Sequence, residues 1–470
     1  MFGAGRTKSQ QHTTTKMKTY TRPCRRSIVK SSLTTGLCFV SIVLVNAAVD
    51  PGPRTGTADA GTQLPGLSTS ESNAFVIAQT TFNEVDSVNG TIAGEADSGL
   101  GPRFNMNSCA GCHAFPASGG TSPQSNPQTT VATLHGAHNI VPSFITANGP
   151  VREARFIKNP DGTPDGGVHA LFVITGRSDA PAGFNLPQTD FASQVAANNV
   201  IFRIPTPTFG TGLIESITEQ TILNNQAANA SVKAQLGISG HPNRSGNDGT
   251  ITRFGWKAQN KSLLMFSGEA YNVEQGVTND LFPNARELGN QTLPAGQPES
   301  TVDLATGGIG DIEQFMIFMR LLDAPKRRNP PGVSNASIAA GNTNFNNVGC
   351  IQCHTPSLTT GPSPVAALSN KTVPLYSDLL VHHMGWRLAD NVSQGGAAGD
   401  EFRSAPLWGL GQRIFLLHDG RMTDLEQAIR AHASEALGTT VASEANTVVQ
   451  NFINLSDAQK QDMFNFLRSL

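Results

Sequence analysis

Apolar residues at helical spacing mark several short segments of this chain, and they predict a fold that is mainly all-α. Leu425, Ile429 and His432 fall at i, i+4 and i+7, so they lie on one face of an expected helix. The segment Thr423-Asp-Leu-Glu426 has the pattern of a capping box, with Thr423 as the N-cap of that helix. Residues 71–85 and 337–346 are also expected to be helical.

The C-terminal segment has the same kind of pattern. Ser456-Asp-Ala-Gln459 is a second capping box, and Met463, Phe464 and Leu467 form the apolar stripe of the helix that it begins. Stretches rich in Pro, Gly, Ser and Thr separate the expected helices and are typical of loops. Residues 168–176 are expected to form a short strand.

The N-terminal segment has the layout of a secretory signal. Residues 1–48 contain eight basic residues and no acidic one, then a short apolar run, Leu37 to Val45, and then Asn46-Ala-Ala. A membrane span needs about 20 apolar residues, so this run is too short to be one. We therefore expect a signal peptide over 1–48, a linker over 49–70 and a periplasmic protein without stable membrane insertion. An uncleaved N-terminal anchor is the alternative.

Length and charge narrow the class of protein. The 470 residues are enough for two or three domains, and the 14% of charged residues is well below the usual share of about 25%. The formal net charge is −2. A nucleic-acid-binding protein normally has a basic excess, so no nucleic-acid partner is expected.

The cysteines are the most informative residues. Cys24 and Cys38 lie in the expected signal peptide, and the other four form the motifs Cys109-Ala-Gly-Cys112-His113 and Cys350-Ile-Gln-Cys353-His354. C-x-x-C-H is the attachment motif of c-type haem, in which both thiols bind the haem and the adjacent histidine ligates the iron. The sequence therefore predicts two covalently bound haem c groups, with His113 and His354 as proximal ligands.

The two halves of the chain share further motifs in the same order. FRIPTPTFGTG begins at Phe202 and FRSAPLWGLG at Phe402, and each is followed by a segment in which Trp256 matches His418. Repetition of this kind indicates an internal duplication. We expect a first haem domain over 71–325, enlarged by insertions, and a second over 326–470.

These motifs resemble those of a known family. GLGPRFNMNSCAGCH, RFGWKAQ, EFRSAPLWGLG and LHDGRMTDLEQAI are similar to segments of the dihaem oxidoreductases, also called thiol oxidoreductases. That family is distantly related to bacterial dihaem cytochrome c peroxidases and to the dihaem enzymes that mature methylamine dehydrogenase. The resemblance runs from about residue 71 to the C-terminus. It implies two cytochrome c-like domains, each holding one haem.

The resemblance also suggests how the two irons differ. In the related peroxidases the segment around His432 supplies a distal ligand, usually Met, so His432 implies a second haem with two histidine ligands. Met422 and Met384 are alternatives. The repeat places Ala270 at the matching position of the first half, which leaves the first iron open. His135 or His138 could still supply a displaceable ligand there.

Other residues receive roles from the same comparison. Glu274 follows Trp256 by 18 residues, as a catalytic glutamate does in the related peroxidases, although E-M-G there is E-Q-G here. Glu274 is thus the expected acid–base, with Glu215 as the alternative, and Trp256 is expected to pass electrons between the haems. Haem propionates need charged or hydrogen-bonding partners. The candidates for that role are Arg403, Arg421 and His418.

The function expected from these features is reduction of hydrogen peroxide, or of another small oxidant, at the first haem. A small donor such as a cytochrome or a cupredoxin would supply electrons through the second haem. The alternatives are a dihaem electron-transfer cytochrome without peroxidase activity, an oxygen- or peroxide-dependent oxidase of an organic substrate, and a redox sensor. The sequence offers no support for a calcium ion.

Overall fold

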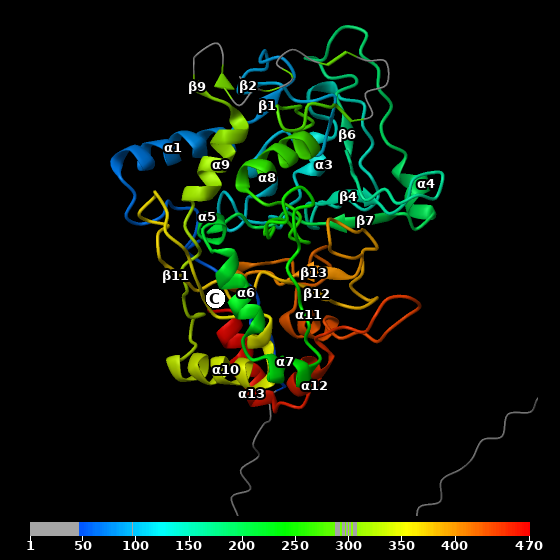
Figure 1. Cartoon of the computed structure of the whole chain (residues 1–470). Coiled ribbons are helices and arrows are strands. Elements are labelled where there is room, and N and C mark those ends of the chain that lie inside the picture. Colours follow the sequence, from blue (N-terminus) through cyan, green and yellow to red (C-terminus); the bar gives the residue numbers. More distant parts are fainter. Residues whose placement is uncertain are drawn as a thin grey trace, which may run out of the picture. The chain divides into compact units, whose positions relative to one another are not determined.

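Short helices and very short strands, joined by long irregular segments, make up the computed structural model of the chain (Figure 1). The structure describes residues 47–95, 97–286, 292–293, 297, 299, 302–303 and 308–470. The expected signal peptide lies almost entirely outside the described residues. Asn46–Leu470 form one compact unit, and the domain boundary expected near residue 325 stays a prediction.

The expectation of a mainly all-α fold is wrong. The chain is 30% helical and 14% strand, so its fold is mixed α/β. Most of its strands are only two residues long, and several pair with a strand far along the chain, as β3 does with β6 and β4 does with β7. Segments this short are below the length at which alternation of apolar and polar residues reveals a strand.

The helices carry the following bounds. The α-helices are α1 Thr69–Asn83, α2 Cys109–Cys112, α3 Gln128–Val131, α4 Phe191–Ala196, α5 Thr211–Glu215, α6 Glu219–Ala227, α7 Ala230–Leu236, α8 Leu263–Ala270, α9 Asp311–Leu321, α10 Asn335–Val348, α11 Leu425–Ala431, α12 Asn446–Ile453 and α13 Asp457–Leu467. The 3₁₀ turns are η1 Leu134–Gly136, η3 Cys350–Gln352 and η4 Leu410–Gln412, and η2 Tyr271–Gln275 is a π-helix.

The strands form small separate sheets. They are β1 Asp86–Ser87, β2 Asp97–Ser98, β3 Arg103–Phe104, β4 Glu153–Phe156, β5 Val168–His169, β6 Phe172–Val173, β7 Val200–Arg203, β8 Val302–Asp303, β9 Gly308–Ile309, β10 Leu358–Thr359, β11 Thr372–Val373, β12 Val381–His383 and β13 Glu401–Arg403. The largest sheet described has the order β5-β4-β7, and β12 pairs with β13. Both of the F-R motifs end a strand, β7 and β13.

Each haem motif contacts one helix of a packed helix pair. In the first half α1 packs on α9, where Phe82 and Phe318 have ring centroids 4.4 Å apart (Figure 1). In the second half α10 packs on α13. Gly341 permits this approach, since a Cβ there would lie 2.0 Å from the Asp462 carbonyl oxygen. The expected helices over 71–85 and 337–346 are thus confirmed as α1 and α10.

The capping boxes have different outcomes. Ser456 and Gln459 form the expected box at the start of α13. The N-cap of α11 is Asp424 and not Thr423, because the Asp424 carboxylate accepts the Gln427 N–H. The shift by one residue is small, because Thr and Asp both serve as N-caps.

The two halves of the chain meet through their shared motifs. Ile204, just after β7, donates its N–H to the His418 carbonyl oxygen at 2.9 Å, and Arg403 in β13 donates its N–H to the Trp256 carbonyl oxygen at 2.9 Å. Each F-R segment therefore pairs with the Trp or His segment of the other half. A buried ion pair between Arg203 and Asp390, at 2.6 Å, adds a further link.

Candidate functional site

The first haem motif borders a cavity of about 740 Å³. Cys112 and His113, at the end of α2, line this cavity. His113 Nδ1 lies 3.0 Å from the Gly120 carbonyl oxygen, which assigns the ring proton to Nδ1 and leaves Nε2 free. Burial lowers the pKa of His113 to about 4, so the imidazole is neutral, the form that ligates a metal.

Ala270 and Glu274 line the same cavity. They lie four residues apart, and the helix continues between them because α8 runs directly into the π-helix η2. Gly276 ends η2 with a φ of 73°, and a Cβ there would lie 1.9 Å from the Arg103 carbonyl oxygen, so only glycine fits. The backbone carbonyl of Glu274 accepts the Asn105 N–H at 2.6 Å, which holds η2 against the segment before α2.

The Glu274 carboxyl has an unusual environment. Burial raises its pKa to about 8, and the negative charges of Glu153 and Glu269 add to the increase, against the opposing charge of Arg155. All four of these side chains line the first cavity. A carboxyl group with a pKa near neutrality can both accept and donate a proton at the pH of the cell.

The alternatives for the first site lie elsewhere. Glu215 receives a hydrogen bond from the Leu263 N–H and pairs with Arg320 at 2.7 Å, so it anchors the start of α8. His135 Nε2 lies 2.8 Å from the Glu95 carboxylate, and His138 packs against Gly176. None of these three residues is among the described residues that line the first cavity.

The second haem motif borders a larger and mainly apolar cavity of about 1420 Å³. It is lined by Cys350, Cys353, His354 and His432. His354 Nδ1 lies 3.1 Å from the Tyr376 carbonyl oxygen, and His432 Nδ1 lies 2.7 Å from that of Ala428. Both rings therefore present a free Nε2 in one cavity. Burial lowers the pKa of both histidines, to about 4 for His354.

The remaining candidates of the second half separate into two groups. His418 and Met384 line the second cavity, where His418 stacks on Phe402 with ring centroids 4.2 Å apart. Met422 is not among the described residues that line it. Arg421 is exposed, pairs with Asp419 and lies outside the three cavities of this site, so the structure does not bring it to a haem pocket.

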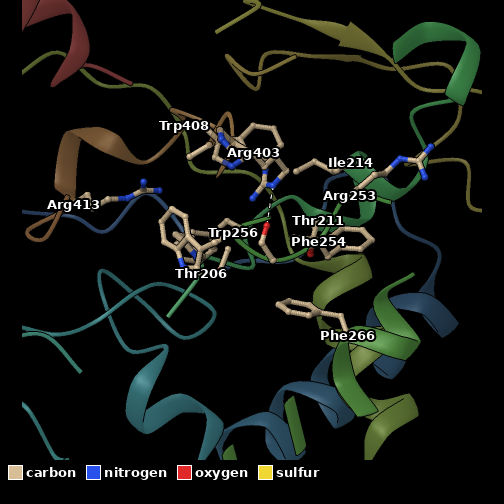
Figure 2. Close-up of a pocket in the computed structure, with 15 residues that line it drawn as sticks. Thr206, Thr211, Ile214, Arg253, Phe254, Trp256, Phe266, Arg403, Trp408 and Arg413 are labelled. Atoms are coloured by element: carbon tan, nitrogen blue, oxygen red, sulfur yellow. Dashed lines mark hydrogen bonds between the residues drawn. The ribbon is translucent and has the colours of Figure 1, made fainter. Parts of the chain in front are cut away.

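A third cavity, of about 500 Å³, shares lining residues with each of the other two, and Figure 2 shows the side chains that line it. Trp256 lines all three cavities, and its indole N–H donates to the Ile204 carbonyl oxygen at 2.9 Å. Arg403 lines the second and third cavities and donates from Nε to the Gly255 carbonyl oxygen at 3.1 Å, the bond drawn in Figure 2. The indole therefore lines both the cavity beside the first haem motif and the cavity beside the second.

Sequence reasoning did not include several charged residues that the structure brings to these cavities, among them Glu153, Glu269 and Arg413. Glu153 and Glu269 line the first cavity, and Arg413 lines the second and third. A signal for Arg413 was available, because it stands two residues after Gly411 of the second G-x-G, where the first repeat has Ile214. No comparable pattern marks Glu153 or Glu269.

The donor sets suit haem. Each motif offers two thiols that form no disulfide and a neutral imidazole with a free Nε2. The second cavity has mainly apolar walls, whereas the first also has charged and polar side chains in its lining. Burial raises the pKa of Cys109, Cys112 and Cys350, which leaves these thiols protonated. No described helix is long and apolar enough to cross a membrane.

Comparisons with curated sequences and with solved structures say little about this chain. No curated protein sequence matches the chain. Among solved structures, a MauG-like protein associated with microbial copper homeostasis matches at 15% identity and a TM-score of 0.27, over 54% of this chain and 89% of its own. Hydrazine synthase of Kuenenia stuttgartiensis matches at 18% identity and a TM-score of 0.22, over 34% of this chain and only 55% of its own length. At these scores neither likeness supports an argument.

The family comparison is decisive. The model described as "Di-haem oxidoreductase, putative peroxidase" matches residues 153–470, which is more than half of the chain. The match includes the second haem motif, Trp256, Glu274 and His432, and it begins after the first haem motif. The cofactors of the family are haems, and its chemistry is oxidation and reduction. The chain belongs to the di-haem oxidoreductase family.

Proposed function

We propose that this chain is an exported dihaem c-type oxidoreductase that reduces hydrogen peroxide. In the proposal the cavity beside Cys350–His354 holds the haem that accepts electrons, and the cavity beside Cys109–His113 holds the haem at which peroxide reacts. The signal-like N-terminal segment supports a periplasmic location. The haem motifs agree with it, because c-type haem is attached outside the cytoplasm.

The observation that carries the proposal is the asymmetry of the two cavities. The second contains two histidines with free Nε2 atoms, His354 and His432. Among the described residues, the first cavity is lined by one histidine, His113, together with Ala270 and Glu274. A haem with two protein ligands mainly transfers electrons, whereas a haem with an open position binds small oxidants.

Reduction of one hydrogen peroxide to two waters consumes two electrons and two protons. Cys109, Cys112 and His113 would hold the first haem, which when bound would supply the redox chemistry for reducing the peroxide bond. Glu274 supplies the proton transfer: its carboxylate takes a proton from one peroxide oxygen and returns it to the other, which leaves as water. Ala270 leaves space for peroxide beside Glu274, because its side chain is small and has no group that could ligate iron.

Trp256 is the proposed electron relay between the two haems. Its indole lines both haem cavities and is held by the hydrogen bond to Ile204. A small protein donor, such as a cytochrome or a cupredoxin, would supply the electrons to the second haem one at a time.

Spectroscopy with stopped-flow mixing tests this function. We expect one of the two ferric haems to be high-spin or to bind cyanide, and the other to stay low-spin. Peroxide should oxidise the fully reduced protein on the timescale of stopped-flow mixing. With a small electron donor present, the protein should reduce peroxide repeatedly. Two low-spin haems with neither cyanide binding nor a peroxide reaction would instead establish an electron-transfer cytochrome.

Intact mass tests the cofactors separately. The secreted protein should weigh two haems more than its polypeptide, because each C-x-x-C-H motif forms two thioether bonds. Acid–acetone should not extract these haems. The double variant Cys109→Ser, Cys112→Ser should lose the mass of one haem and retain the spectrum of the other. A parent protein with only one attached haem would contradict the prediction.

A further inference from the structure

Two guanidinium groups are buried in the third cavity without an acidic partner. Arg403 is 7% exposed and Arg413 is 9% exposed, and both line this cavity (Figure 2). Within the described part of the chain, the Arg403 side chain donates only to backbone carbonyls, those of Gly255 and Ser404. The Arg413 guanidinium has no hydrogen bond or ion pair with any described residue.

The neighbouring charged groups do not neutralise these two arginines. Arg468 donates to the Arg413 carbonyl oxygen, but its own charge is balanced by Asp50 at 2.6 Å. Asp378 acts on Arg403 through space but binds His382 at 3.0 Å. Burial lowers the pKa of Arg403 and of Arg413 to about 10, which still leaves both groups positively charged at neutral pH.

An unpaired buried charge is costly, and proteins normally place an opposite charge beside it. The rest of this cavity provides none. Its third arginine, Arg253, is also buried and donates to the carbonyl oxygens of Ile251 and Ile217. No Asp or Glu is among the described residues that line the cavity. The site is therefore complementary to an anion, and a planar guanidinium matches a carboxylate best.

The position of the two arginines identifies the carboxylate. Both also line the second cavity, together with His354 and His432. A haem placed there carries two propionate carboxylates on one edge, and two arginines stand where the second and third cavities join. We propose that Arg403 and Arg413 bind the propionate carboxylates of the second haem, beside Trp256 and Trp408. This inference rests on the proposed dihaem function.

The pairing has an electrochemical consequence. Two positive charges beside the haem edge stabilise the reduced iron, which has one positive charge fewer than the oxidised iron. Arg403 and Arg413 would therefore raise the reduction potential of the second haem. Their removal should lower it, without any direct effect on the first haem's distal side.

The experiment is a redox titration of the purified dihaem protein without peroxide. In Arg413→Met we expect the equilibrium constant for reduction of the low-spin haem to fall at least tenfold, which is about 59 mV for one electron. The propionate bending band in the resonance Raman spectrum should shift as well. Arg387→Met is the matched control, because Arg387 is exposed and pairs with Glu435 in the same half of the chain. It removes the same charge and should leave both signals unchanged.

A second variant keeps the inference testable if Arg413→Met does not fold. Arg413→Lys keeps the charge and loses the two-pronged geometry, so the Raman band should shift while the potential changes little. An unchanged Raman band in Arg413→Lys, or a potential in Arg413→Met equal to that of Arg387→Met, would overturn the inference. A free small carboxylate is the rival occupant. A potential of the parent protein that depends on added acetate would also overturn it.

The outcome separates this inference from the proposed function. Intact mass establishes whether the second haem is attached, and the titration involves no peroxide. If both haems are attached and Arg413→Met leaves the reduction potential unchanged, the propionate site is refuted and the proposed function is not.

Discussion

Replacing Glu274 by glutamine is expected to slow peroxide reduction by about 10²- to 10⁴-fold, the usual contribution of a general acid–base residue. Glutamine keeps the size of the side chain but cannot accept the peroxide proton. The carbonyl of residue 274 would still accept the Asn105 N–H, so η2 should keep its place. Stopped-flow rates with peroxide measure the loss, while haem content and reduction by dithionite should match the parent.

The pH profile distinguishes proton transfer from a structural effect. Glu274 must be deprotonated to accept the peroxide proton, and its pKa is raised to about 8. The rate of the peroxide reaction should therefore rise with pH, with a midpoint at about pH 8. Glu269→Gln removes a neighbouring negative charge that contributes to the raised pKa, so it should move the midpoint of the profile to lower pH. In Glu274→Gln this dependence should disappear.

Glu215→Gln is the comparison for the Glu274 variant. Glu215 lies outside the first cavity and pairs with Arg320, so its variant should keep peroxide activity within a few-fold of the parent. If Glu274→Gln also stays within a few-fold, the assignment of the acid–base is wrong. A large loss in Glu215→Gln, with haem content unchanged, would transfer the role to Glu215.

Replacing His432 by alanine should convert the low-spin second haem to a high-spin form, because the iron loses one of two histidine ligands. His432 follows the last residue of α11, and its described side-chain hydrogen bond goes to the Ala428 carbonyl within the same turn. Its removal should therefore leave the fold intact. Electron paramagnetic resonance and visible spectra report the change, and added imidazole should restore the low-spin spectrum.

Met384→Leu provides the control for the His432 variant. Met384 lines the second cavity and is the remaining methionine candidate there, since Met422 does not line it. Met384→Leu should keep the second haem low-spin. An unchanged low-spin spectrum in His432→Ala, with a high-spin one in Met384→Leu, would assign the ligand to Met384.

Much of the candidate site was predictable from the sequence because its chemistry depends on local spacing. Two thiols and a histidine within five residues define each haem motif without reference to the fold. Helical spacing likewise relates Leu425 to His432, and Ala270 to Glu274, and in both cases the side chains lie along one stretch of helix. Motif order and spacing were also sufficient to recognise the family, which the match to residues 153–470 confirms.

The fold class was beyond reach of such local patterns. The strands that make this fold mixed α/β are two to four residues long, and several of them pair with strands remote in sequence, as β4 does with β7. Arg421 illustrates the same limit for single residues: nothing in the sequence shows that its side chain turns to Asp419 and solvent instead of a haem pocket. Arg413, two residues after the motif that ends at Gly411, lines the cavities instead.

The sequence by itself determined the cofactor motifs, the family and the difference between His432 and Ala270, because each depends on residue identity at short range. Only the tertiary structure decided which side chains share a cavity. It brings Trp256 from the first half against Arg403 from the second, and it gathers Glu153, Glu269 and Glu274 around one space. These groups come together because burial of apolar surface packs distant segments of the chain against each other. The spacing of residues within one segment does not reveal such long-range contacts.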